Sequence, residues 1–127
     1  MAKNQFQEKR KMDCIRRTEE IMPFLPPFCK EFFIGIENIT SPLTRLNYAV
    51  DLRIFFDYLS KKVLYKPVQE MTLSDLDKIT ASDIEQFLSY LSHYKHLNKE
   101  LSCNEKAKQR KLSSVRSLFK YFFNKDK

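Results

Sequence analysis

The sequence predicts an all-α protein: a small orthogonal bundle of four to five helices with an extra helix at the N-terminus. Glycine occurs once in 127 residues, and Leu, Phe, Lys and Glu are abundant. Runs of β-branched residues are few, so the composition favours helices over strands. A chain of this length is predicted to form one domain around one modest core.

Charge and cysteine content limit the function classes. The formal net charge is +7, which points to an acidic partner, with nucleic acid first and an anionic membrane second. The alternative is a protein that is merely soluble and basic. Three isolated cysteines without CxxC spacing argue against a disulfide framework or a zinc site. No window reaches the roughly 18 apolar residues of a membrane span. The charged N-terminus does not fit a signal peptide, so the sequence predicts a cytoplasmic protein without a membrane partner.

The N-terminal region is set apart by prolines. Residues 3–21 read as a charged, weakly amphipathic helix that either frays or packs on a partner. Three prolines at positions 23, 26 and 27 end it. We therefore predict an N-terminal helical extension over residues 1–23 and a single domain over residues 24–127.

A phenylalanine-rich helix follows over about residues 27–36, and Gly35 near its end is typical of a helix C-terminus. The aromatic cluster of this region admits two interpretations, a core or a surface that contacts a neighbouring protomer. Its members are Phe24, Phe28, Phe32 and Phe33.

The third helix is predicted from Ser41, a good N-cap followed by Pro42 at the first helical position, to about Lys61. A helical wheel gives it two apolar faces, which is typical of a central helix. One face comprises Leu43, Leu46, Val50 and Ile54, and the other Tyr48, Leu52, Phe55 and Leu59. A narrow strip of Arg45, Ala49 and Arg53 lies between them, where an outside partner can touch the helix.

The middle of the chain is acidic. Thr72 can start a single helical turn, and Thr80 begins a helix that is predicted to run to about Tyr94, with a linker over residues 93–101. Residues 63–91 contain five acids and two bases, so this region is expected to face away from a polyanion.

The last helix, predicted over Cys103–Phe123, is amphipathic and cationic. A capping box of Ser102 and Glu105 precedes it. From residue 104 to the end there are eight Lys or Arg against two acids. Its apolar face carries Leu112, Val115, Phe119 and Phe122, and its polar arc carries Lys106, Gln109, Arg110, Ser113, Arg116, Ser117 and Lys120. Lys108 and Lys111 lie on the flank, where their stems can pack while their amines reach solvent.

Three motifs carry a family resemblance. They are Ser41-x-x-Thr44-x-x-x-Tyr48-x-x-Asp51-Leu52, then Ile79-Thr80-Ala81-Ser82-Asp83-Ile84, then Arg110-Lys111-Leu112-Ser113-Ser114-Val115-Arg116. In this order and spacing, over about residues 24–123, they resemble the N-terminal core-binding (SAM-like) domain of tyrosine recombinases, the phage-integrase family. The resemblance implies a helical bundle that forms one half of a clamp around duplex DNA.

The resemblance also implies which residues contact DNA, namely Thr44, Arg45 and Arg53 on the third helix and Lys106, Gln109, Arg110, Ser113 and Arg116 on the last. Lysine and arginine neutralise phosphates. Ser41 and Thr44 at a helix N-terminus can donate to a phosphate, and Lys111 completes the predicted set. Gln109 and Arg110 are residue types that read adenine and guanine edges. The alternative is that these side chains only solvate their helices, or that Arg53 pairs with Asp57.

No catalytic, metal or cofactor residues are predicted. The family's cleavage chemistry needs an arginine, lysine, histidine and tyrosine set on a C-terminal domain, so this fragment is expected to bind without catalysis. His93 and His96 are read as surface residues rather than metal ligands. Tyr121 is interpreted as a packing or phosphate-contacting residue rather than a nucleophile.

The function predicted from the sequence is therefore duplex DNA binding, as the N-terminal module of a site-specific tyrosine recombinase active in DNA integration and recombination. The expected partners are DNA, the catalytic domain of the same protein and neighbouring protomers on DNA. The alternative is a helical protein-interaction module that uses the phenylalanine-rich helix around residues 28–36. Under that alternative the basic helix only confers solubility.

Overall fold

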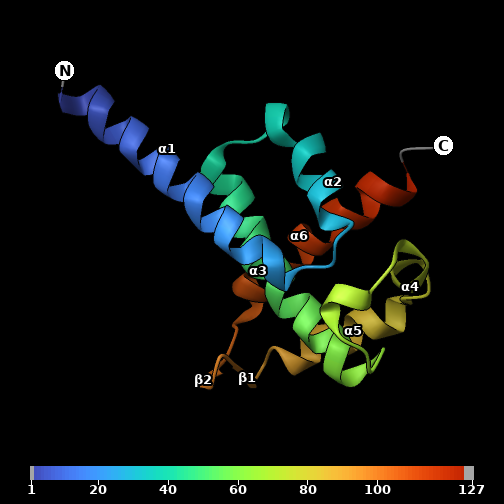
Figure 1. Ribbon diagram of the computed structural model, residues 1–127. Helices are drawn as coiled ribbons and strands as arrows, with labels where there is room; N and C mark the ends of the chain where they lie inside the picture. Colours follow the sequence, from blue (N-terminus) through green and yellow to red (C-terminus); the bar gives the residue numbers. More distant parts are fainter. Residues whose placement is uncertain (1, 125–127) are drawn as a thin grey trace.

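The computed structural model describes residues 2–124, and over this range the fold is almost entirely helical (Figure 1). The elements are α1 (Ala2–Ile21), η1 (Met22–Phe24), α2 (Cys29–Gly35), η2 (Glu37–Ile39), α3 (Pro42–Lys62), η3 (Val68–Glu70), α4 (Leu73–Asp77), α5 (Ala81–Tyr90), β1 (Tyr94–His96), β2 (Lys99–Leu101) and α6 (Glu105–Phe123). The predicted helical bundle with an extra N-terminal helix is confirmed, with a small hairpin added. Within residues 2–124, none of the helices has the length and apolar content that a membrane span needs.

Helix α3 is the centre of the bundle, as its two apolar faces predicted. The hydroxyl of Ser41 accepts a hydrogen bond from the backbone N–H of Thr44 at 3.1 Å, which caps the helix where the sequence predicted its start. Leu52, Phe55 and Phe56 on α3 are at most 1 % exposed. The other helices are therefore positioned by how they pack on α3.

The aromatic side chains of the phenylalanine-rich helix belong to the core. Phe32 and Phe33 are buried, and Phe28 makes edge-to-face contacts with Phe56 of α3 and Phe122 of α6. Helix α2 thus ties α3 to the C-terminal half of α6. Because these rings are covered, the Phe-rich helix does not offer them as an exposed docking surface.

Helix α1 packs along α3 over its C-terminal half. Cys14, Thr18 and Ile21 are its half-buried positions, and Phe24 just beyond α1 lies under the Arg53 side chain of α3. The helix runs alongside α3, and its N-terminal part projects beyond the rest of the molecule (Figure 1). The extension therefore docks on its own domain over part of its length.

Helices α4 and α5 begin at the predicted residues. Thr72 and Thr80 each form a complete capping box with the aspartate three residues later. Helix α5 ends at Tyr90, however, and not near Tyr94 as predicted. It buries Phe87 fully, and the chain then turns into the hairpin.

The segment predicted as a linker is the antiparallel hairpin β1–β2. Tyr94 pairs with Leu101 and His96 with Lys99, which leaves a two-residue turn. The turn residues Leu97 and Asn98 have φ values of 52° and 64°. A two-residue turn with both φ values positive matches the twist of the strands, but it usually carries Asn-Gly or Asp-Gly. Leucine at the first position gave no signal in the sequence.

Glycine at position 35 is explained by packing. Its φ is not positive, so it does not adopt the left-handed conformation that often ends a helix. The ring of Tyr121 on α6 lies directly against its Cα. A Cβ built on Gly35 would be 2.5 Å from Cε1 of Tyr121. The absence of a side chain at position 35 therefore lets α6 approach α2.

Replacement of this glycine tests the close approach. Gly35→Ala is expected to lower the free energy of unfolding by about 1–3 kcal/mol in urea titrations, because the added methyl displaces the tyrosine ring. In a Tyr121→Ala background the same change should cost nothing, since alanine favours the helix. An equal loss in both backgrounds would contradict this explanation.

Candidate nucleic-acid interface

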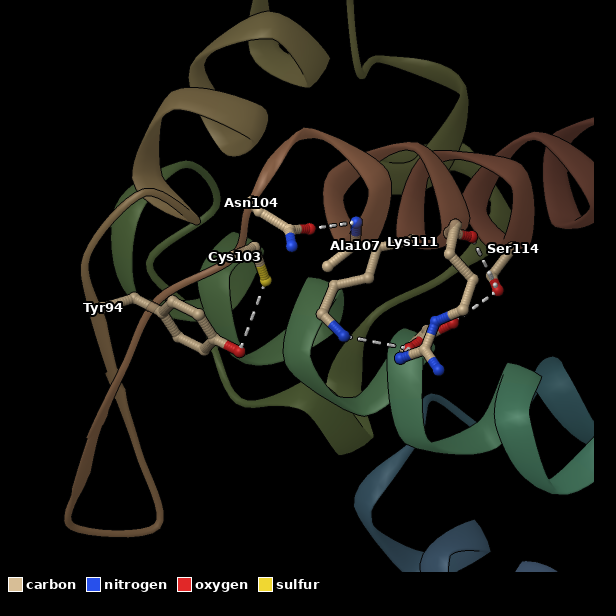
Figure 2. A network of polar contacts seen from close by, with 8 residues as sticks. Tyr94, Cys103, Asn104, Ala107, Lys111 and Ser114 are labelled. Atoms are coloured by element: carbon tan, nitrogen blue, oxygen red, sulfur yellow. Dashed lines mark hydrogen bonds and ion pairs between the residues drawn. The ribbon is translucent and has the colours of Figure 1, made fainter.

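A buried carboxylate, Asp51, joins α3 to α6. It is 1 % exposed and accepts hydrogen bonds from Oγ of Ser114 (2.8 Å), Nη2 of Arg110 (3.1 Å) and Nζ of Lys111 (3.2 Å). Figure 2 shows Lys111 and Ser114 reaching from α6 toward α3. A buried carboxylate requires such partners, because an unpaired charge in the interior is strongly destabilising. The network fixes the point at which α6 crosses α3.

The burial of Lys111 overturns one prediction. Its side chain is 7 % exposed and its amine is bound to Asp51, so the amine does not reach solvent. Lys108, on the same flank, donates to Oγ of Ser92 at 2.6 Å and is 14 % exposed. Both lysines hold α6 in place, so the predicted outward reach of their amines is wrong.

The N-terminus of α6 is also capped differently from the prediction. Asn104, and not Ser102, is the N-cap, and its side-chain oxygen accepts from the backbone N–H of Ala107 at 2.8 Å (Figure 2). The preceding thiol of Cys103 donates to the hydroxyl of Tyr94 at 3.9 Å. Burial raises the pKa of Tyr94 to about 12, and the neighbouring Cys103 adds to this shift. The hairpin is thus anchored against the start of α6.

The polar arc of α6 is exposed, in agreement with the helical wheel. Lys106, Gln109, Ser113 and Arg116 are all exposed. Arg110 lies at the edge of this row, with 56 % of its side chain exposed and one guanidinium nitrogen bound to Asp51. The buried network therefore holds one member of the row, while the remaining cations are open to a partner.

The N-terminus of α3 lies near the C-terminal end of the polar arc, at Ser117 and Lys120. Ser41 is exposed and Thr44 is half-buried, and their hydroxyls are hydrogen-bonded to each other at 3.0 Å. The residue before the cap, Thr40, lines a shallow hollow together with Ser117 and Lys120 of α6. Two of the predicted positions on α3 are therefore close to the cationic helix.

Arg45 and Arg53 do not join them. Arg45 donates to the backbone oxygens of Glu37 (2.9 Å) and Thr40 (2.7 Å), and so closes the turn before α3. Arg53 stacks on the ring of Phe24 at 3.9 Å, and Ala49 between the two arginines is fully buried. At about 100° per residue, Arg53 lies on the side of α3 opposite the α6-bound Asp51. Arg45 and Arg53 are therefore held by the turn before α3 and by Phe24, and both are only half-exposed.

A different part of α3 is open. Leu43 and Val50 were predicted to pack, yet they are 53 % and 36 % exposed, and Asn47 between them is also exposed. Their i, i+4, i+7 spacing places them on one stripe, which we call the exposed strip of α3. It adjoins Asp51 and hence Arg110. Sequence reasoning missed this strip, since Leu43 and Val50 extend the regular apolar pattern of the helix.

The two histidines differ from each other. His93 is exposed as predicted, but the side chain of His96 is 12 % exposed and lies 3.8 Å from Asp57. Burial lowers the pKa of His96, an effect that Asp57 opposes and Arg53 reinforces. Residues 2–124 contain no group of three His, Cys, Asp or Glu that could hold a metal ion.

Residues 30–125 match the model of the phage integrase N-terminal SAM-like domain. The chain belongs to this family. The match begins inside α2 and covers α3 to α6, so it includes the buried network, the exposed row and the exposed strip, while α1 lies outside it.

The phage-integrase SAM-like chain is 34 % identical over 110 residues to the tyrosine recombinase XerC of Caldanaerobacter subterraneus subsp. tengcongensis. The matched part is 80 % of this chain and 30 % of that relative, so the chain spans about a third of its length. No solved structure matches the chain.

The buried network makes a stability prediction. Asp51→Ala should lower the free energy of unfolding by about 3–5 kcal/mol, because it leaves Lys111 charged and unpaired in the interior. The matched change Asp57→Ala, at a half-exposed carboxylate paired with the exposed Lys61, should cost about 1 kcal/mol or less. Urea titrations of the two variants decide the matter, and similar losses in both would refute the special role of Asp51.

Proposed function

We propose that the chain binds duplex DNA as the N-terminal module of a tyrosine recombinase. The observation that carries the proposal is the exposed row of α6, in which cations and hydrogen-bonding side chains alternate on one face. This row contains Lys106, Gln109, Arg110, Ser113 and Arg116. Family membership and the resemblance to a recombinase support the same conclusion.

The residues of the row suit different parts of a duplex. Lys106 and Arg116 would neutralise phosphates and release counterions. Gln109 and Arg110 are suited to base edges in the major groove, where an amide can pair with adenine and a guanidinium with guanine. Ser41 and Thr44 at the start of α3 would add phosphate contacts through hydroxyl and backbone N–H groups.

The buried members of the predicted set support this surface indirectly. Lys111 would act through Asp51 by holding α6 in position, and Arg45 by closing the turn that presents Ser41. Arg53 lies on the other side of α3 and is not part of the proposed surface. The catalytic step of a recombinase, and contacts to a catalytic domain or to neighbouring protomers, would belong to the longer protein in which such a module works.

A lysine of the row tests the proposal. Lys106→Gln should weaken binding to a mixed-sequence duplex and reduce the slope of log affinity against log salt by about 1, because one phosphate contact is lost. Lys78→Gln, which removes an exposed lysine from the acidic region between α4 and α5, is the matched control and should leave the slope unchanged.

Fluorescence anisotropy over about 50–200 mM salt gives both affinity and slope. Wild-type affinity that is independent of salt would refute electrostatic DNA binding by this chain. Equal effects of the two lysine variants would show that only net charge matters, and would refute the proposed surface.

A further inference from the structure

Helix α1 borders the exposed strip of α3 on the side away from α6. Its half-buried residues, among them Cys14 and Thr18, face α3, so its other side chains are directed sideways or outward. The helix lies outside the region matched by the family model. Whatever α1 adds to the domain is therefore a property of this chain rather than of the matched family region.

Two arginines of α1 lie beside that strip. Arg10 and Arg17 are both exposed and are two helical turns apart, about 10 Å along the axis. Together with Phe6 they line a surface hollow of about 710 Å³ to which α3 contributes Leu43. Because Leu43 begins the exposed strip, the two guanidinium groups flank the strip at its N-terminal end.

These arginines differ from Arg16 and Lys11, which are paired with acids of α1. Arg16 is bound to both Asp13 and Glu20, and Lys11 pairs with Glu8 at 3.7 Å. Within residues 5–124, neither Arg10 nor Arg17 forms an ion pair, and the guanidinium of Arg10 lies 5.9 Å from the ring centre of Phe6. Asp13 also lines the hollow, but Arg16 neutralises it. The charge of this side of α1 is thus available to an anionic partner.

Helix α1 and helix α6 flank α3 from opposite sides. Phe24, at the end of α1, contacts Arg53, while α6 contacts Asp51, and the two α3 residues point about 160° apart. Packed helices are about 8–10 Å apart, so the axes of α1 and α6 are separated by about 16–20 Å where they flank α3. This span exceeds the roughly 12 Å width of the DNA major groove, which the two phosphate backbones border.

We propose that α1 forms a second cationic flank of the DNA-binding surface, with Arg10 and Arg17 on the phosphates of one strand and Lys106 and Arg116 of α6 on those of the other. The exposed strip of α3 would then face the groove between them, with Asn47 at its middle. The inference rests on the proposed function and names a binding element outside the matched family region. An anionic membrane fits less well, since the exposed apolar side chains of this face are interspersed with charged and polar ones and do not form one continuous apolar face. They are Phe6, Met12, Leu43 and Val50.

Two double variants of the full chain separate this inference from a net-charge effect. Arg10→Gln/Arg17→Gln should weaken binding to the same duplex about tenfold or more at moderate salt and lower the salt slope by about 2. The control, Lys62→Gln/Lys78→Gln, removes the same charge from two exposed lysines outside the proposed surface, at the C-terminal end of α3 and just after α4, and should leave the slope unchanged. Circular dichroism checks that both variants keep their helices.

The outcomes are distinct. Equal slopes for the wild type and Arg10→Gln/Arg17→Gln would overturn the role of α1, while a loss on Lys106→Gln in the same assay would leave the proposed function standing. Equal losses in the two double variants would also overturn it, because the position of the lost charges on the molecule would not matter. Absence of salt-dependent binding by the wild type would overturn both proposals. Binding to anionic vesicles but not to duplex would identify a membrane partner instead.

Discussion

The position of the last helix depends on the side chain of Asp51, which accepts hydrogen bonds from three side chains of α6 inside the bundle. A carboxylate placed in the interior is stable only while its donors remain in reach, so the crossing point of α3 and α6 is strongly determined. Hydrophobic packing alone would tolerate small shifts of one helix along the other. The ionic contact adds the directional term that packing lacks.

Cations of the domain fall into two classes by their partners. Lys111, Lys108 and Arg45 are engaged inside the fold, by a carboxylate, a hydroxyl and backbone oxygens respectively. Lys106 and Arg116 project from α6 into solvent. Because the first class holds the helices, the second class can be presented on a fixed surface without internal partners. Net charge alone would not distinguish the two classes.

Much of the fold follows from local patterns. Three helix starts were predictable because a side-chain cap acts over only three residues. They are marked by Ser41 with Pro42, by Thr72 and by Thr80. The turn at Leu97 could not be predicted from the sequence. Leucine rarely adopts a positive φ, and strand pairing holds it in that conformation here. The polar row of α6 was also predictable, since one face of a helix is a local property.

The rest of the candidate surface depends on which helix covers which. Arg45 and Arg53 share a stripe in the sequence, but α1 and the turn before α3 partly cover that stripe and leave both arginines half-exposed. The same packing leaves Leu43 and Val50 open, although their periodicity is that of buried residues. From the sequence, Lys111 looks like a lysine at the edge of the apolar face of α6. Its partner Asp51 lies 60 positions earlier in the chain. Contacts over such separations leave no signal in a single sequence.

We propose that the exposed row of α6 and the N-terminal half of α3 form one DNA-binding surface. Backbone amide chemical shifts, followed by NMR while a duplex is added, test it residue by residue. The account predicts the largest changes over residues 105–117 and 41–50, and small changes over α4 and α5. Changes centred on α4 and α5, with those of α6 unaffected, would contradict it.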